Sequence, residues 1–190
     1  MNKKCFVYIY DANEICLEKL NFSTLPRSVV SYLDSKKKSP KFFQSQIAWY
    51  YLCKVLDEEF KYDLTKLVFS LEKHKKPRIE GVHFSISHSN DLIAFCVGNS
   101  PCSIDIELMK ARDFSKLTKK LTEIPMDVTQ PESFYRKWCA GECLFKLGEE
   151  EKNYSLSFYK TKDSNLNAYM LCVCSNDALE MKSSLTTTRC

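Results

Sequence analysis

The segment from Phe84 to Glu107 limits the fold more than any other part of the chain. It spans three runs of strand-forming residues that follow one another closely, VHFSISHS, LIAFCVG and CSIDIEL. The first two runs flank the turn residues SND, a pattern that predicts an antiparallel pair of strands. The third run follows NSP, which is also typical of a loop. A sheet of short, closely connected strands is therefore expected in the middle of the chain.

The third run ends with two acids that are separated by a single isoleucine. Residues two apart on a strand point to the same face, so Asp105 and Glu107 should project together, while Ile104 and Ile106 face the other way. Two like charges side by side repel each other, and a positive group is expected near them. An exposed strand face is the alternative explanation for this pair.

The first half is predicted to begin with a strand and two helices. The run CFVYIY indicates a buried strand, because it is rich in β-branched and aromatic residues. Pro26 suits the first turn of a helix at about residues 25–35. Residues 41–60 contain no glycine or proline and have apolar residues near a spacing of 3.6, which predicts a long helix. Its expected apolar positions are Phe43, Ile47, Tyr50, Tyr51 and Val55.

The other predicted elements lie on both sides of a change in character near residue 100. Residues 67–72 are predicted as a strand and residues 73–78 as a turn. Beyond NSP, a short helix is expected at residues 114–121 and a second long helix at residues 131–147. The strands predicted in this half are residues 102–108, 154–161 and 167–174.

Each half thus has strands, one dominant helix and a closing pair of strands. This pattern predicts an α+β fold of two similar lobes, residues 1–100 and 101–190, with the boundary near Gly98 to Pro101. With 190 residues, of which 44% are apolar, the chain can bury a core. Two complete lobes in one chain favour a monomer.

The charge of the chain is mildly basic and concentrated in two runs. There are 28 Lys and Arg residues against 24 Asp and Glu residues, a formal charge of +4, which does not by itself indicate a nucleic-acid partner. The runs KKKSPK at residues 36–41 and KHKKPR at residues 73–78 together hold eight basic residues. They form either an anion-attracting surface or a solvated lysine-rich face.

Ten cysteines are present, and no pair has the C-x-x-C spacing. Most lie in apolar runs such as YMLCVC, where a free thiol packs as a small hydrophobic group. The N-terminus reaches Asp11 after too few apolar residues for a signal peptide, and no apolar run approaches the roughly 20 residues of a membrane helix. A reducing, cytoplasmic location with no membrane partner is therefore expected.

The second long helix offers another acid and a lysine. Glu142 and Lys146 are four residues apart and share one face, with Trp138 one turn earlier. Taken alone, they are better explained by a surface ion pair. Together with Asp105 and Glu107 they supply three carboxylates, enough for a Mg²⁺ ion that keeps positions for water and phosphate oxygens. Lys146 would then neutralise the same phosphates.

His88 lies between two serines at the end of a predicted strand. It is either a hydrogen-bonded structural residue or part of a phosphate-binding set with the basic turn at residues 73–78. A catalytic triad is not indicated, because the G-x-S-x-G pattern is absent and the acids are grouped together.

Four of these segments, in this order, resemble the motifs of the Sfp-type 4′-phosphopantetheinyl transferases. They are KKP (75–77), FSISHS (84–89), SIDIE (103–107) and FYRKWCAGECLFK (134–146). The family shows G-K-P, an F-N-x-S-H-S-like strand, G-[IV]-D-[IV]-E and F-x-x-x-W-[ST]-x-K-E-A-x-x-K at similar spacing. Four motifs in register are far more specific than any one of them.

This resemblance implies an activity and a fold. The family transfers the phosphopantetheine arm of coenzyme A to a serine of an apo acyl or peptidyl carrier protein and releases adenosine 3′,5′-bisphosphate, the reaction of a holo-[acyl-carrier-protein] synthase. Its fold consists of two similar α+β lobes related by a pseudo-twofold axis, with the cofactor between them. The N-terminal lobe would hold the nucleotide, and the C-terminal lobe would carry the metal ligands and the catalytic helix.

The resemblance also assigns roles to individual residues. Asp105, Glu107 and Glu142 match the magnesium ligands, and Glu142 would also help to deprotonate the attacking serine. Lys146 matches the lysine that contacts the pyrophosphate of coenzyme A. The residues expected around the nucleotide and its phosphates are Lys75, Lys76, Ser85, Ser87 and His88.

The motifs differ from the family pattern at several positions. The lysine before the helix glutamate is Gly141 here, and the alanine after it is Cys143. Ser103 replaces the glycine of G-[IV]-D. The arginine that the family places in the first long helix is absent, and Lys41 or Lys75 are candidates to replace it. Two alternatives therefore stay open: a homologue that binds coenzyme A or a carrier protein without turnover, and another Mg²⁺-dependent phosphate enzyme.

Overall fold

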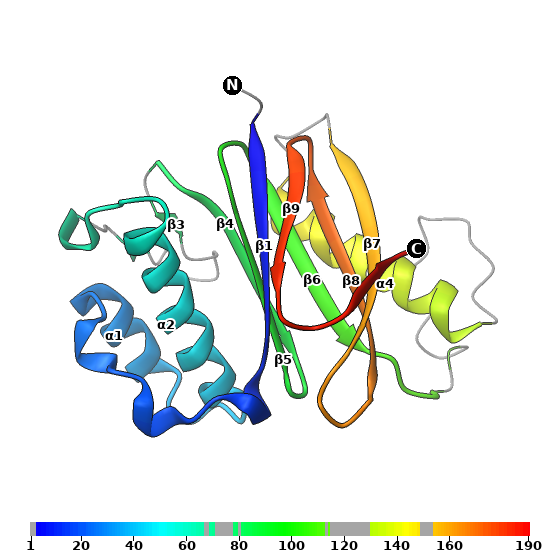
Figure 1. The fold of residues 1–190 in the computed structure, drawn as a ribbon, viewed down its shortest axis with the longest axis horizontal. Helices are drawn as coiled ribbons and strands as arrows, with labels where there is room; N and C mark the ends of the chain where they lie inside the picture. The colour runs from blue at the N-terminus through cyan, green and yellow to red at the C-terminus, as the bar shows by residue number, and fades with distance from the viewer. Residues whose placement is uncertain are drawn as a thin grey trace.

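The computed structural model describes residues 3–66, 69–70, 78–79, 81–112, 114, 130–148 and 154–190. These residues form an α+β fold with two four-stranded sheets and a two-stranded ladder. Figure 1 shows how the strands and helices are arranged. The α+β class expected from the sequence is therefore confirmed. Most of the predicted strand at 67–72, the turn at 73–78 and the helix at 114–121 lies outside the described residues, and so do Lys75 and Lys76.

The first sheet has the strand order β4-β5-β1-β9. Strands β4 and β5 form the antiparallel pair that the SND turn predicts. Strand β1 pairs with β5 in the antiparallel sense and with β9 in the parallel sense, so the end of the chain returns to this first sheet. The strands are β1 (Lys4–Asp11), β4 (His83–Ser89), β5 (Leu92–Gly98) and β9 (Ala178–Ser183).

The second sheet has the order β10-β7-β8-β6, and all of its neighbouring strands are antiparallel. A two-stranded ladder of β2 and β3 stands apart from both sheets. The strands are β6 (Cys102–Leu108), β7 (Ser155–Lys162), β8 (Ala168–Ser175) and β10 (Thr187–Arg189), with β2 (Phe69–Ser70) and β3 (Arg78–Ile79). Short 3₁₀ turns occupy Ala12–Glu14, Leu17–Lys19, Phe22–Thr24 and Leu64–Lys66.

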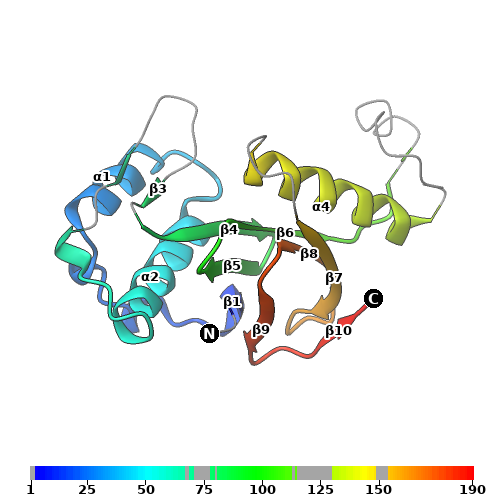
Figure 2. The ribbon, with the colours of Figure 1, turned by 90° about the horizontal axis from the view of Figure 1, so that it is seen from above.

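Each sheet carries one long helix, as predicted. Helix α2 (Phe42–Glu58) packs on β5 and β4, next to the shorter α1 (Arg27–Ser35). Helix α4 (Pro131–Leu147) packs on β8 and β6. Figure 2 shows the two long helices well apart, each against its own sheet. Among the described residues, no helix is both long enough and apolar enough to cross a membrane.

The predicted apolar face of α2 is only partly correct. Ile47 and Val55 are buried, but Phe43 is 55% exposed. Phe43 lies in the first turn of α2, whereas the buried residues of the helix lie further along and include Trp49 and Leu52, because α2 contacts both α1 and the sheet.

The two sheets share one hydrophobic core. Side chains of β1 and β5 from the first sheet and of β6 and β8 from the second sheet contact one another in a single buried cluster. Its members include Ile9 and Leu92 on one side and Ile104, Ile106 and Leu171 on the other. Ile104 and Ile106 thus lie in this core, and Asp105 and Glu107, which alternate with them, point to the opposite face of β6, as predicted.

The cysteines are free, and eight of the ten are buried. Only Cys16 and Cys190 are exposed. This burial confirms that most of the thiols pack as small apolar groups.

Candidate functional site

The two sheets meet where β4 lies beside β6, and serine side chains join these strands. Ser87 Oγ accepts a hydrogen bond from the backbone N–H of Ile106 at 3.3 Å. Two residues further along, Ser89 Oγ accepts one from the N–H of Leu108 at 3.1 Å. In both hydrogen bonds the two residues are 19 positions apart in the sequence, so β4 and β6 run parallel to each other.

The same two serines also hold the acid pair. Ser87 donates a hydrogen bond to Asp105 Oδ1 at 2.8 Å, and Ser89 donates one to Glu107 Oε2 at 2.9 Å. The alternating serines of FSISHS therefore place both carboxylates on one face of the junction. Ser89 was not predicted as a site residue, although its spacing from Ser87 was a signal for it.

Asp105 has a positive partner, as the repulsion argument requires. Its side chain is almost fully buried, and Lys146 Nζ donates to Oδ1 at 2.7 Å and to the carbonyl of Ile104 at 2.9 Å. The other carboxylate oxygen, Oδ2, is buried and has no hydrogen-bond partner within the described part of the chain. A buried oxygen of this kind is costly to leave unsatisfied, so the site is suited to a further cationic or hydrogen-bonding group.

Glu107 lies in an environment that disfavours its charge. Burial raises the pKa of its carboxyl group, and the negative charge of Asp105 raises it further. The hydrogen bond from Ser89 and the charge of Lys41 act in the opposite direction. A cation between the two acids would relieve this repulsion.

Helix α4 is held against β6 and β8 by two of the residues that differ from the family motifs. Ser103 Oγ donates a hydrogen bond to the backbone carbonyl of Cys143 at 2.8 Å, and Cys143 Sγ contacts the carbonyl of Cys172 at 3.2 Å. These contacts fix the part of α4 that carries Glu142 and Lys146. The substitutions at residues 103 and 143 are therefore compatible with the expected position of the helix.

A pocket of about 350 Å³ opens at this junction. It brings together seven of the nine predicted site residues, and the remaining two, Lys75 and Lys76, lie outside the described residues. The predicted residues in its lining are Ser85, Ser87, His88, Asp105, Glu107, Glu142 and Lys146.

The opposite wall of the pocket comes from α1 and the beginning of α2. It contains Lys41 and Ser45 together with an aromatic group, in which Trp49 contacts Tyr32 and Phe84 edge to face. Apart from Lys41, these residues were not predicted as site residues, because an aromatic residue on a helix face has the same pattern whether it lines a pocket or a core.

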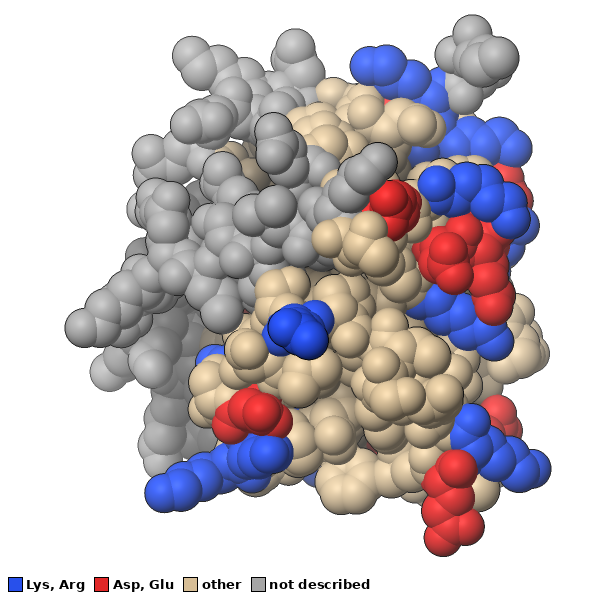
Figure 3. Space-filling model, turned by 90° about the vertical axis from the view of Figure 1, so that its left-hand side faces the viewer, with Lys and Arg blue, Asp and Glu red and all other residues tan. Residues whose placement is uncertain are grey.

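The basic run at residues 36–41 is divided between the surface and the pocket. Lys37 forms an exposed ion pair with Asp34 at 2.9 Å, and Lys36 lies over the ring of Tyr32. Only Lys41 of this run lines the pocket. On the described part of the α1 and α2 side of the molecule, basic and acidic side chains are intermixed, as Figure 3 shows.

His88 faces the pocket in its neutral form. Burial, followed by the positive charge of Lys41, lowers the pKa of its imidazole to about 4. At neutral pH the ring can therefore donate and accept hydrogen bonds, but it does not add a positive charge for phosphate binding.

The fold and this pocket define a class of protein: an α+β protein that offers three carboxylates and two lysines in a pocket at the junction of two sheets.

Over 118 residues, the chain is 26% identical to the 4′-phosphopantetheinyl transferase psf-1 of Bacillus pumilus. The match covers 57% of this chain and 51% of the relative, so the chain spans about half the length of the curated relative that it matches. No protein-family model matches the chain. The resemblance expected from the four motifs is thus confirmed by a curated relative of that class.

Proposed function

We propose that this protein transfers the 4′-phosphopantetheine arm of coenzyme A to a serine of an apo acyl or peptidyl carrier protein and releases adenosine 3′,5′-bisphosphate. The observation that carries this proposal is the pocket, in which Asp105, Glu107, Glu142 and Lys146 converge from two separate motifs. The similarity to psf-1 supports the same assignment. The protein would act as a monomer in the cytoplasm, as a holo-[acyl-carrier-protein] synthase.

The residues present fit a Mg²⁺ ion. Asp105, Glu107 and Glu142 are hard oxygen donors on one pocket, and Asp105 Oδ2 is buried without a partner among the described residues. Mg²⁺ commonly binds through a few carboxylates and keeps positions for water and phosphate oxygens. When bound, the ion would neutralise charge on the phosphate oxygens during the displacement.

The chain's own lysines would position the pyrophosphate. Lys146 already forms a close ion pair beside the acid cluster, and its ammonium group can donate to phosphate oxygens as well as to Asp105. Stabilisation of negative charge by fixed donors is the main contribution that a protein makes to phosphoryl transfer. Lys146 is therefore a catalytic residue in this proposal.

The α1 and α2 wall would receive the nucleotide end of coenzyme A. Lys41 lines the pocket and acts electrostatically on both His88 and Glu107, so its charge reaches the region between the two sheets. It can replace the arginine that is missing from the first long helix. Neutral His88 would complete the binding by hydrogen bonding, together with Ser85 and Ser87.

Glu142 would accept the proton of the carrier serine. It lines the pocket on α4, four residues before Lys146, and is half-buried. A carboxylate next to the serine hydroxyl can act as a general base, since it can accept the hydroxyl proton as the new O–P bond forms. Residues 1–100 would hold the nucleotide and residues 101–190 the catalytic groups, in two lobes related by a pseudo-twofold axis.

The test measures the release of adenosine 3′,5′-bisphosphate from coenzyme A in reactions with and without an apo carrier protein. Chromatography detects the product. The proposal predicts release that requires both the carrier and Mg²⁺ and that stops with EDTA. Release without a carrier would instead favour another Mg²⁺-dependent phosphate enzyme. Binding of coenzyme A without any release would favour a homologue that has lost turnover, for which Gly141 and the missing arginine are the supporting features.

A further inference from the structure

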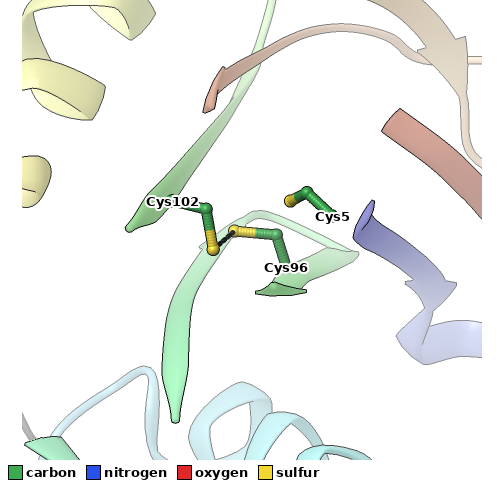
Figure 4. Close-up of side chains that lie close together, drawn as sticks. All are labelled: Cys5, Cys96 and Cys102. Carbon is green, nitrogen blue, oxygen red and sulfur yellow. Dashed lines mark hydrogen bonds between the residues drawn. The ribbon is translucent and has the colours of Figure 1, made fainter. Parts of the chain in front are cut away.

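Three cysteine thiols meet at a second location, outside the pocket. Cys5 of β1, Cys96 of β5 and Cys102 of β6 come from three different strands, and their sulfur atoms all lie within 4.8 Å of one another. The sulfurs of Cys96 and Cys102 are 3.5 Å apart. Figure 4 shows the three side chains converging on one another. We call these residues the thiol cluster.

The thiol cluster is enclosed by the shared core. Cys5 and Cys96 are 0% exposed, and Cys102 is 6% exposed. Apolar side chains of both sheets belong to the same buried cluster. Cys102, which follows Pro101, is the most exposed of the three.

We propose that the thiol cluster binds a thiophilic divalent cation of the Zn²⁺ type. Three cysteine sulfurs in one set are a common part of structural zinc sites, in which the Zn–S distance of about 2.3 Å gives S···S separations near 3.8 Å. The sulfurs of Cys96 and Cys102 are slightly closer than this, and the other two separations are at most 4.8 Å. Small rotations of the three side chains are therefore enough to form the site.

A fourth donor lies nearby in the turn between β8 and β9. One carboxylate oxygen of Asp177, Oδ2, is buried and has no hydrogen-bond partner within the described residues. Asp177 acts electrostatically on both Cys5 and Cys102. The strand pairing explains this, because Cys102 is opposite Ser175 and Cys5 is opposite Leu179, on the two sides of the turn.

The donor set favours a divalent ion over Cu⁺. Three thiolates and the carboxylate of Asp177 leave a net charge of about −2 around Zn²⁺ but about −3 around Cu⁺, and buried net charge is destabilising. A carboxylate oxygen is also a hard ligand, which suits Zn²⁺ better than Cu⁺.

Cysteine binds metal ions as the thiolate. Binding of the cation would therefore exchange the thiol protons of the cluster for the metal and release them to the solvent.

A cation at this position would connect the two sheets. Cys5 and Cys96 belong to the first sheet, and Cys102 belongs to the second. The metal would stabilise the folded chain by binding only when these strands are assembled. It would thereby support the junction that carries the pocket.

The test uses the full chain with the two exposed cysteines replaced, Cys16→Ser and Cys190→Ser, reduced and free of metal. Co²⁺ is titrated as a spectroscopic probe, and Zn²⁺ binding is measured by native mass spectrometry. The proposal predicts one equivalent of thiolate-bound metal, which gives a thiolate-to-cobalt absorption band, and a higher unfolding temperature with Zn²⁺. Cys96→Ala should weaken binding by at least about tenfold, because a direct ligand is lost.

A matched control is Cys53→Ala, which removes a buried thiol of α2 outside the cluster and should leave metal binding unchanged. If Cys96→Ala fails to fold, Asp177→Asn provides the second variant, because this turn residue is not part of the core and its loss should also weaken Zn²⁺ binding. The proposal is overturned if the parent protein binds no metal, or if the Cys53 and Cys96 variants bind it equally.

Discussion

Asp105 is a buried carboxylate whose two oxygen atoms have different surroundings. Oδ1 accepts hydrogen bonds from Ser87 and Lys146, while Oδ2 has no partner in the described chain. The negative charge of Asp105 is therefore balanced mainly by Lys146 when no other cation is bound. Removing one member of a buried ion pair is more destabilising than replacing both, because it leaves an unpaired charge.

Lys146→Ala is accordingly expected to lower the free energy of unfolding by about 2–4 kcal/mol in the presence of EDTA. Part of this loss should be recovered with Mg²⁺, which can occupy the vacant cationic position beside Asp105. Urea denaturation of wild type and variant, with EDTA and with Mg²⁺, measures both effects.

The control for this experiment is Lys160→Ala, which removes the exposed ion pair between Lys160 and Glu132. Such surface pairs contribute up to about 1 kcal/mol. Equal losses in the two variants, or no effect of Mg²⁺ on Lys146→Ala, would contradict the account of the buried pair.

His88 makes stability depend on pH in a defined direction. Its pKa is lowered to about 4 in the folded protein, so the unfolded chain takes up a proton first as the pH falls. The stabilisation is complete above the unfolded pKa of about 6.5 and is lost as the pH falls toward 4.

We expect wild type to lose about 2 kcal/mol more than His88→Gln between pH 7.5 and pH 5. Denaturant unfolding of both proteins across this range measures the difference, and comparison of the two cancels the titration of groups that they share. Parallel stability curves would show that His88 titrates normally in the folded state.

Lys41 is the residue that we assign to the phosphates at the nucleotide end. Lys41→Ala should raise the KM for coenzyme A by roughly 10-fold, the effect of one charge-assisted hydrogen bond, with a smaller change in kcat. Lys38→Ala is the matched control, because Lys38 is an exposed member of the same basic run and is not in the pocket lining. An equal change in both variants would mean that only the overall charge matters.

At the scale of elements, local sequence patterns predicted the main strands and helices. Each of these elements is indicated by residues that lie close together in the sequence. They include the strand CFVYIY, the strand pair around SND and the helix at residues 131–147. Strands β9 and β10 were missed. Strand β9 is only partly buried and depends on parallel pairing with β1, at the other end of the chain, so its own residues carry little signal.

Helix α4 contains a glycine where the structure does not need one. Gly141 lies in the helix interior, and a Cβ atom added there would have no neighbour within 4 Å among the described atoms. Gly141→Ala should therefore raise the free energy of unfolding by about 0.5–1 kcal/mol, because alanine loses less backbone entropy in a helix. Thermal unfolding measures the gain.

Gly148→Ala provides the contrast at the end of the same helix. Gly148 has φ +93°, a conformation that residues with a side chain rarely adopt, so this substitution should be destabilising despite the open space around it. A stabilisation at residue 148, or a loss at residue 141, would contradict the backbone account of α4.

On the scale of the whole molecule, the candidate site was predictable only in part. Strand alternation and helical spacing predicted which faces Asp105, Glu107, Glu142 and Lys146 occupy, because these are local properties. The buried contact of Lys146 with Asp105 and the wall from α1 and α2 depend on how the two sheets meet. So does the thiol cluster, whose members come from three strands and appear in the sequence as ordinary core cysteines.

The measurement that tests the central claim most directly is the mass of an apo acyl carrier protein after incubation with this protein, coenzyme A and Mg²⁺. Wild type should add the mass of one phosphopantetheine arm to the carrier. EDTA, Glu107→Ala and Glu142→Ala should each abolish the gain, while the variants remain folded because removal of an acid relieves repulsion in the cluster. An unchanged carrier mass with wild type, or an equal gain with both acid variants, would contradict the assignment of this pocket as the transfer site.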